Sequence, residues 1–193
     1  MLHLKLPTDP RWANVAEKNL DEILIDHAYC EQKAATSCIS LIVQYPEKEE
    51  LVETLSPVVT EEWDHFRRVI DEMKKRGIKL GKQRKDEYVN QLYKQLKKGG
   101  SRDEQLVEKL LMCALIEARS CERFKTLWKG LEDEGLKAFY YELMVSEAGH
   151  YVNFIQLARK YLPREHVDKR WQELLDAEKQ ILATLTPRGD RMH

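Results

Sequence analysis

The sequence contains few of the residues that interrupt helices. Its 193 residues include 8 glycines and 6 prolines, and no stretch rich in glycine, proline and serine divides the chain. Because glycine and proline are the least favourable residues inside a helix, their scarcity favours long helices. With no linker, we expect residues 1–193 to form a single domain. We expect the last residues, 186–193, to be a disordered tail.

Long apolar runs and targeting signals are also missing. No apolar run approaches the roughly 18 residues that a membrane span needs. The N-terminus has no basic stretch followed by an apolar one, which argues against a secretory signal. Hydrophobic residues make up 42% of the chain, enough for a sizeable core. We therefore expect a cytoplasmic protein with no membrane partner.

Cysteine pairs of the metal-binding type are absent. The four cysteines, at positions 30, 38, 113 and 121, form no C-x-x-C pair, which argues against a rubredoxin or zinc-ribbon module. We expect reduced thiols, as is usual in a cytosolic protein. Cys30 and Cys121 lie near the candidate ligands described next, where they either tune the site or simply pack in the core.

Two Glu-x-x-His motifs are the most informative feature that is present. Each is preceded by a lone glutamate, at a separation of 31 residues in the first case and 30 in the second. One such motif could arise by chance. Two motifs that lie on the apolar faces of predicted helices, with matched spacing to an upstream glutamate, indicate a functional site. The six residues are Glu31, Glu62, His65, Glu117, Glu147 and His150.

These residue types at these spacings suit a pair of metal ions. A glutamate and a histidine three positions apart project side by side from one helix. Four carboxylates and two imidazoles from four helices match the ligand set of a di-iron or di-manganese bundle. Carboxylate and imidazole ligands with open positions favour non-haem iron, with manganese as a substitute. Without metal, so many carboxylates in an apolar core would be unfavourable.

Apolar periodicity predicts an all-α fold. Residues 77–102 form a long connection that suits the crossover of a ferritin-like four-helix bundle, followed by an additional C-terminal helix. Pro57 predicts a kink or a restart with Ser56 as the cap, and Ser101 or Asp103 is expected to cap the third bundle helix. The expected helices span 10–44, 48–76, 103–129, 132–161 and 164–185, with a short helix near 87–97.

Basic residues are concentrated in one segment of an otherwise acidic chain. Residues 74–102 contain eleven lysines and arginines but only two acidic residues. Such a run is either a solvated face or a surface that follows phosphates, and Tyr88 and Tyr93 are candidates for stacking on bases. The candidate RNA-binding residues are Lys75, Arg76, Lys79, Lys82, Arg84, Lys85, Lys97 and Lys98.

Other side chains near the candidate ligands have two possible roles. His27 lies one helical turn before Glu31, and it is either a hydrogen-bond donor to the site or a core histidine. Tyr29, Tyr140 and Tyr151 also lie near ligands in the sequence. A radical role is conceivable for them, but core packing is the favoured interpretation.

From Trp12 to Leu185 the chain resembles the MiaE-type tRNA hydroxylases, a family of ferritin-like di-iron proteins. The resemblance implies that all six residues bind iron and act through it. It implies O2-dependent hydroxylation of the isopentenyl group of 2-methylthio-isopentenyladenosine beside the anticodon. O2 is then a co-substrate, an external reductase supplies electrons, and the partner is the tRNA anticodon stem-loop and not DNA. The stretches that carry it are residues 26–34 (DHAYCEQKA), 61–66 (EEWDHF), 75–78 (KRGI), 118–124 (ARSCERF) and 146–150 (SEAGH).

Three other functions remain open. A ferritin-type ferroxidase or iron-storage protein would have the same ligands, but the long basic connection disfavours it. A di-iron oxidase of a small acyl or aldehyde substrate would need an apolar channel and no salt-sensitive RNA binding. A helical RNA-binding module with a vestigial metal site would bind RNA without turnover.

Overall fold

The computed structural model describes residues 2–185 and 189–192. Within those residues the chain forms seven α-helices and no β-strand, and none of these helices could cross a membrane. The chain divides into two compact units. Residues 11–85 with 189–192 form the α2–α3 unit, and residues 2–10 with 86–185 form the α5–α6 unit. The prediction of an all-α chain is confirmed, while the single domain stays a prediction.

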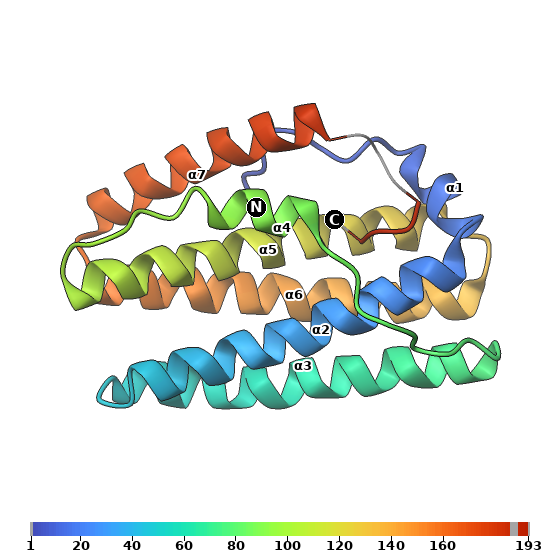
Figure 1. The fold of residues 1–193 in the computed structure, drawn as a ribbon, viewed down its shortest axis with the longest axis horizontal. Coiled ribbons are helices and arrows are strands. Elements are labelled where there is room, and N and C mark those ends of the chain that lie inside the picture. Colours follow the sequence, from blue (N-terminus) through green and yellow to red (C-terminus); the bar gives the residue numbers. More distant parts are fainter. Residues whose placement is uncertain (1, 186–188, 193) are drawn as a thin grey trace. The chain divides into compact units, whose positions relative to one another are not determined.

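The α2–α3 unit is a hairpin of two long helices. Helix α2 (Leu20–Gln44) ends just before the Tyr45-Pro46 step, as expected for a residue that precedes proline. Helix α3 (Glu49–Lys75) returns beside it (Figure 1). The single helix predicted from residue 10 is divided, because a short α1 (Trp12–Glu17) ends before Asn19, whose φ of −127° is not helical.

Helix α3 passes through its proline without a restart. Pro57 lies inside the helix on the solvent side, and the Ser56 hydroxyl donates to the carbonyl of Val52 at 2.6 Å. Ser56 is therefore not a helix cap, and the prediction of a restart there is wrong. The buried neighbours Leu55 and Val58 anchor this stretch, so packing outweighs the backbone hydrogen bond that proline cannot make.

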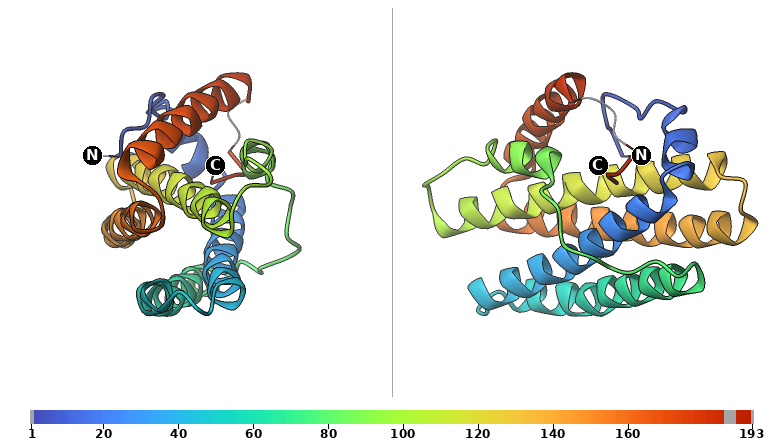
Figure 2. Two further views of the ribbon diagram at one scale, coloured as in Figure 1. Left: turned by 90° about the vertical axis from the view of Figure 1, so that its left-hand side faces the viewer. Right: turned by 45° about the vertical axis from the view of Figure 1, so that its right-hand side comes forward.

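The α5–α6 unit contains a second long hairpin. Helices α5 (Arg102–Gly130) and α6 (Glu134–Tyr161) lie side by side in both views of Figure 2. Helix α7 (Arg164–Thr184) packs against both and against the short helix α4 (Glu87–Tyr93). The predicted short helix, crossover segment and additional C-terminal helix are thus present.

Helix α5 begins with a reciprocal cap. The Ser101 hydroxyl accepts from the Glu104 N–H at 3.2 Å, and the Glu104 carboxylate accepts from the Ser101 N–H at 2.7 Å. Of the two predicted cap residues, the structure selects Ser101. Gly99 and Gly100 precede Ser101 and have φ values of 83° and 82°, which residues with a Cβ rarely adopt. The pair therefore lets the chain turn sharply into the helix.

A buried ion pair joins α5 to α7 within this unit. The Arg119 Nε donates to Glu178 at 2.8 Å, and the Tyr88 hydroxyl donates to the same carboxylate at 3.2 Å. Arg119 also donates to the carbonyl of Leu6 at 2.9 Å, which holds the N-terminal segment against α5. Burial lowers the pKa of Arg119, but Glu178 and the other anionic neighbours outweigh that effect and raise it. The guanidinium is therefore charged at neutral pH.

Part of the predicted tail is held in the α2–α3 unit. The Met192 N–H donates to the Asp26 carboxylate at 2.8 Å, and the Met192 side chain is fully buried. The prediction of disorder is therefore wrong for residues 189–192. The other residues of 186–193 lie outside the described part of the chain.

Candidate metal centre

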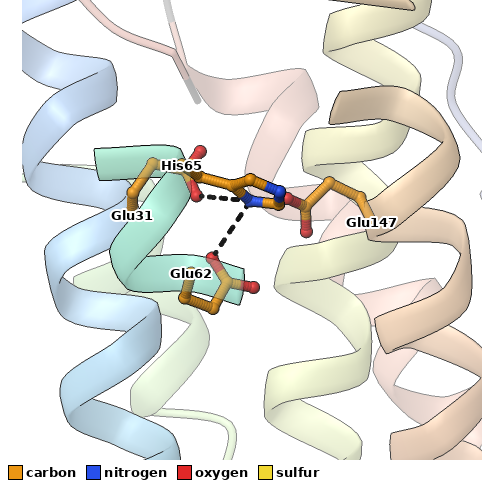
Figure 3. Close-up of side chains that lie close together, drawn as sticks. All are labelled: Glu31, Glu62, His65 and Glu147. Atoms are coloured by element: carbon orange, nitrogen blue, oxygen red, sulfur yellow. Dashed lines mark ion pairs between the residues drawn. The ribbon is translucent and has the colours of Figure 1, made fainter. Parts of the chain in front are cut away.

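Three of the predicted ligands form a buried cluster in the α2–α3 unit. Glu31 comes from α2, and Glu62 and His65 come from α3. The His65 Nδ1 lies 3.5 Å from a Glu31 oxygen and 3.8 Å from a Glu62 oxygen (Figure 3). One ligand atom from each residue lies within 4.8 Å of the others, and Glu62 is 0% exposed.

The helical period of α3 places these donors inside. Leu55, Val58 and Val69 are buried on the same stripe as Glu62 and His65, at intervals of three and four residues. Glu61 and Asp64, which directly precede the two donors along the chain, are exposed. The sequence thus puts one glutamate in the core and its direct neighbour outside.

His27 contacts the cluster directly. Its Nε2 lies 2.6 Å from a Glu31 carboxylate oxygen, and the ring is fully buried. An Nε2–H donated to Glu31 fixes the orientation of that carboxylate, as outer partners of metal ligands commonly do. Of the two roles considered for His27, the contact favours the donor to the site.

The other three predicted ligands form a matching cluster in the α5–α6 unit. Glu117 comes from α5, and Glu147 and His150 come from α6. The His150 Nδ1 lies 3.5 Å from a Glu147 oxygen, and one ligand atom of each residue lies within 4.8 Å of the others. All three side chains are buried. Each unit therefore offers two carboxylates and one imidazole.

The spacing inside each cluster fits a metal ion. Two donor atoms that each lie about 2.1 Å from one ion are separated by about 3 Å at right angles and about 4 Å on opposite sides. The 3.5 Å and 3.8 Å separations in the two clusters fall in that range. Carboxylate oxygens and imidazole nitrogens are ligands that iron and manganese accept. The clusters are therefore suited to metal binding.

Cys121 is a hydrogen-bonded thiol. Its Sγ donates to the carbonyl of Met144 at 3.3 Å, which links α5 to α6. Burial and then the neighbouring Glu147 raise the pKa of Cys121 to about 11. The thiol therefore keeps its proton at neutral pH, which fits the packing interpretation of Cys121. All four cysteines are free of disulfides.

Half of the eight candidate RNA-binding residues are paired with carboxylates. The ion pairs join Lys75 and Arg76 to Glu72, Arg84 to Glu22, and Lys97 to Glu173. The other four are exposed and have no ion-pair partner among the described residues. These are Lys79, Lys82, Lys85 and Lys98, which we call the unpaired lysines.

The two tyrosines of the basic segment differ in exposure. Tyr88 is 1% exposed and donates to Glu178, so the prediction that it stacks on bases is wrong. Its position on the buried side of α4 decides this. Tyr93 is 47% exposed, and its stacking role stays a prediction.

Two of the tyrosines near the ligands have structural contacts. The Tyr29 hydroxyl donates to the carbonyl of Gly81 at 2.8 Å. Tyr140 is buried and packs against Phe124 and Phe139, with ring centroids 5.5 Å and 5.3 Å apart. Both observations fit the packing interpretation.

Sequence reasoning missed the Arg119–Glu178 pair. A signal was present, because Glu178 falls on the apolar stripe of α7 that includes Trp171, Leu174 and Ile181. An acidic residue on such a stripe indicates a buried partner. The identity of the partner, 59 residues away, could not be read from that pattern.

Fold and clusters together define a class. An all-α chain with long-helix hairpins and buried carboxylate–imidazole clusters is a ferritin-like protein of the oxidoreductase type. Residues 1–193 match the family described as tRNA-(MS[2]IO[6]A)-hydroxylase (MiaE). The chain belongs to this family.

Curated relatives and a solved structure agree with that assignment. The chain is 37% identical to the tRNA 2-(methylsulfanyl)-N(6)-isopentenyladenosine(37) hydroxylase of Pseudomonas putida, over 82% of this chain and 76% of the relative. It is 29% identical to the protein of the same name from Salmonella typhimurium, over 81% and 75%. The solved Synechococcus "Protein 43 with aldehyde deformylating oxygenase activity" is similar at a TM-score of 0.91 and 35% identity, covering 98% of this chain and 94% of that one.

Proposed function

We propose that this chain is an O2-dependent monooxygenase that hydroxylates the isopentenyl group of 2-methylthio-isopentenyladenosine next to the anticodon of tRNA. The observation that supports this most is the pair of buried clusters with the same donor set, in a chain that belongs along its whole length to a tRNA hydroxylase family. The names of the curated relatives describe the same substrate. With tRNA as the proposed substrate, a cytoplasmic location is part of the same proposal.

The two clusters together are the proposed ligands of two iron ions, with manganese as a substitute. Glu31, Glu62 and His65 supply three ligands, and the cluster of Glu117, Glu147 and His150 supplies three more. When bound, iron supplies the redox chemistry that lets one atom of O2 enter a C–H bond. The other atom leaves as water, which requires two electrons from a reductase and two protons. The chain's own residues hold the ligand positions and keep the site buried.

Nucleoside analysis tests this function. The protein is loaded with ferrous iron and given O2, a reductant and tRNA that carries the unhydroxylated base. We expect the modified adenosine to gain the mass of one oxygen atom, with the label of 18O2 in the product. Unchanged nucleosides from a protein that has bound iron would refute the proposal.

The unpaired lysines are the proposed contacts to tRNA phosphates. Replacing Lys79, Lys82 and Lys85 together with alanine should weaken tRNA binding and lower the slope of log K against log salt concentration by about 2. Fluorescence anisotropy across a salt series measures both. The matched control replaces three lysines of the same unit that lie outside the basic segment, Lys18, Lys33 and Lys48. An equal loss of slope in the control would show that only net charge matters.

A second candidate function has one specific observation in its favour. The solved protein of similar fold is named for aldehyde deformylating oxygenase activity. A parallel reaction with long-chain aldehydes tests this by measuring formate and the shortened hydrocarbon. Turnover of aldehydes together with no change in tRNA would favour this second function over the first.

A further inference from the structure

A pocket of about 410 Å³ lies between α6 and α7, within the α5–α6 unit. Its volume is in the range of small-molecule sites, about 300–1,000 Å³. Tyr151 and Trp171 form part of its wall, and Val152 lies on its rim at 44% exposure. Gln156 and Gln172 are exposed and also line it. Nothing in the proposed metal chemistry uses this pocket.

The aromatic wall offers two inclined ring faces and an unused hydrogen-bond donor. The rings of Tyr151 and Trp171 have centroids 5.8 Å apart at an angle of 45°, and both residues are buried. The Trp171 indole N–H is buried and has no hydrogen-bond partner among the described residues. Buried polar groups normally have one, so a missing partner indicates a place for a polar ligand or water.

The rim of the pocket is polar and able to recognise hydrogen-bonding edges. Gln156 and Gln172 each present an amide that both donates and accepts, and neither has a protein partner within the described residues. Arg159 and Asp168 form an ion pair at 2.6 Å that closes one side. An aromatic wall beside amides suits a planar heteroaromatic ring, which stacks on one ring face, better than an alkyl chain, which would leave the amides unmatched.

We infer that this pocket binds an unpaired nucleobase of the tRNA. The inference rests on the proposed function and specifies how the substrate is held. Unpaired bases are commonly recognised by stacking on aromatic side chains and by hydrogen bonds to their edges. Tyr151 follows the proposed ligand His150 directly, so the two side chains leave α6 about 100° apart. The pocket therefore takes a neighbouring base and not the one that is oxidised.

A fluorescent base analogue tests the inference on the full-length protein. Anticodon stem-loop RNAs carry 2-aminopurine at one unpaired position at a time, and stacking on an aromatic ring quenches its emission. We expect strong quenching at one position when the RNA binds. Val152→Glu, which places a charge on the rim, should abolish that quenching and weaken binding at least about fivefold, the loss of one stacked base.

The matched control lies on the same helix. Val145 is 55% exposed and does not line the pocket, so Val145→Glu makes the same charge change there. It should leave both quenching and affinity unchanged. Trp171→Leu should lose the quenching too, and because that residue is buried, its fold is checked by circular dichroism. Equal binding and quenching in Val152→Glu and wild type, or no quenched position in bound RNA, would overturn the inference.

Failure of this inference can be told apart from failure of the proposed function. If wild type and Val152→Glu hydroxylate the stem-loop at equal rates and with equal KM, the proposed hydroxylase function is supported and base binding in this pocket is refuted. If wild type neither binds nor hydroxylates the RNA, both the proposed function and base binding in the pocket are refuted. Quenching of 2-aminopurine that a free aldehyde displaces would also overturn it, because the pocket would then suit the alternative substrate.

Discussion

Replacing Glu62 with alanine should lower hydroxylation of tRNA by about a thousandfold or more, because a dinuclear site that loses a ligand no longer holds both ions correctly. Glu62 is fully buried and lies beside His65 on the inner stripe of α3. Iron content per chain should fall with the activity. Metal analysis and nucleoside mass analysis of the same preparation measure both.

The chain supplies its own control for this experiment. Glu61 precedes Glu62 on α3 but faces solvent, so Glu61→Ala should keep iron and activity. The stability of the metal-free protein provides a second test, in which loss of Glu62 should not be harmful. Buried carboxylates oppose folding when no cation is bound, so Glu62→Ala should not lower the free energy of unfolding of the metal-free protein. An equal loss of stability with and without iron would assign Glu62 a structural role and not a ligand role.

Glu178→Gln should destabilise the protein by about 3 kcal/mol, because it removes one of the two carboxylates that pair with the buried Arg119 guanidinium, while Glu122 remains 2.8 Å away. Arg119 is 0% exposed and stays charged, since its anionic neighbours raise its pKa above the usual value despite burial. The Tyr88 hydroxyl also loses the carboxylate that it donates to. Urea unfolding followed by circular dichroism measures the loss.

A surface pair on the same helix provides the control. Glu173 pairs with Lys97 at 2.8 Å while its side chain is 40% exposed, so Glu173→Gln should cost less than about 1 kcal/mol. The double variant Arg119→Met with Glu178→Leu should recover most of the stability lost in Glu178→Gln, because both charges are then removed together. If Glu178→Gln were as stable as wild type, the buried pair would contribute nothing to the stability of the protein.

Helix positions and donor positions were largely predictable from the sequence. Both depend on the 3.6-residue period, which decides for each residue whether it faces inward, whatever it packs against. The long helices therefore lie close to their predicted bounds, and all six candidate ligands are buried. The errors are local: Asn19 divides the first helix, and α3 continues through Pro57 because buried neighbours hold it.

Electrostatic partners were not predictable in this way. The basic segment contains eleven positive residues, yet Lys75, Arg76 and other members are neutralised by acidic side chains. Tyr88 is an aromatic residue in a basic segment, which suggested stacking on bases, but it lies in the core and donates to a carboxylate 90 residues away. A charge count describes a whole segment, whereas a basic side chain is available to bind RNA only if no carboxylate of the protein pairs with it.

By itself, the sequence determined an all-α chain with two recurring sets of carboxylate and imidazole donors, because side-chain period and residue chemistry are local properties. The tertiary structure alone decided how Arg119 is paired, which lysines are unpaired, and that Tyr151 and Trp171 line a pocket. Each of these depends on which helix faces which within a unit. Periodicity gives the buried side of a helix but does not identify the residue that it meets.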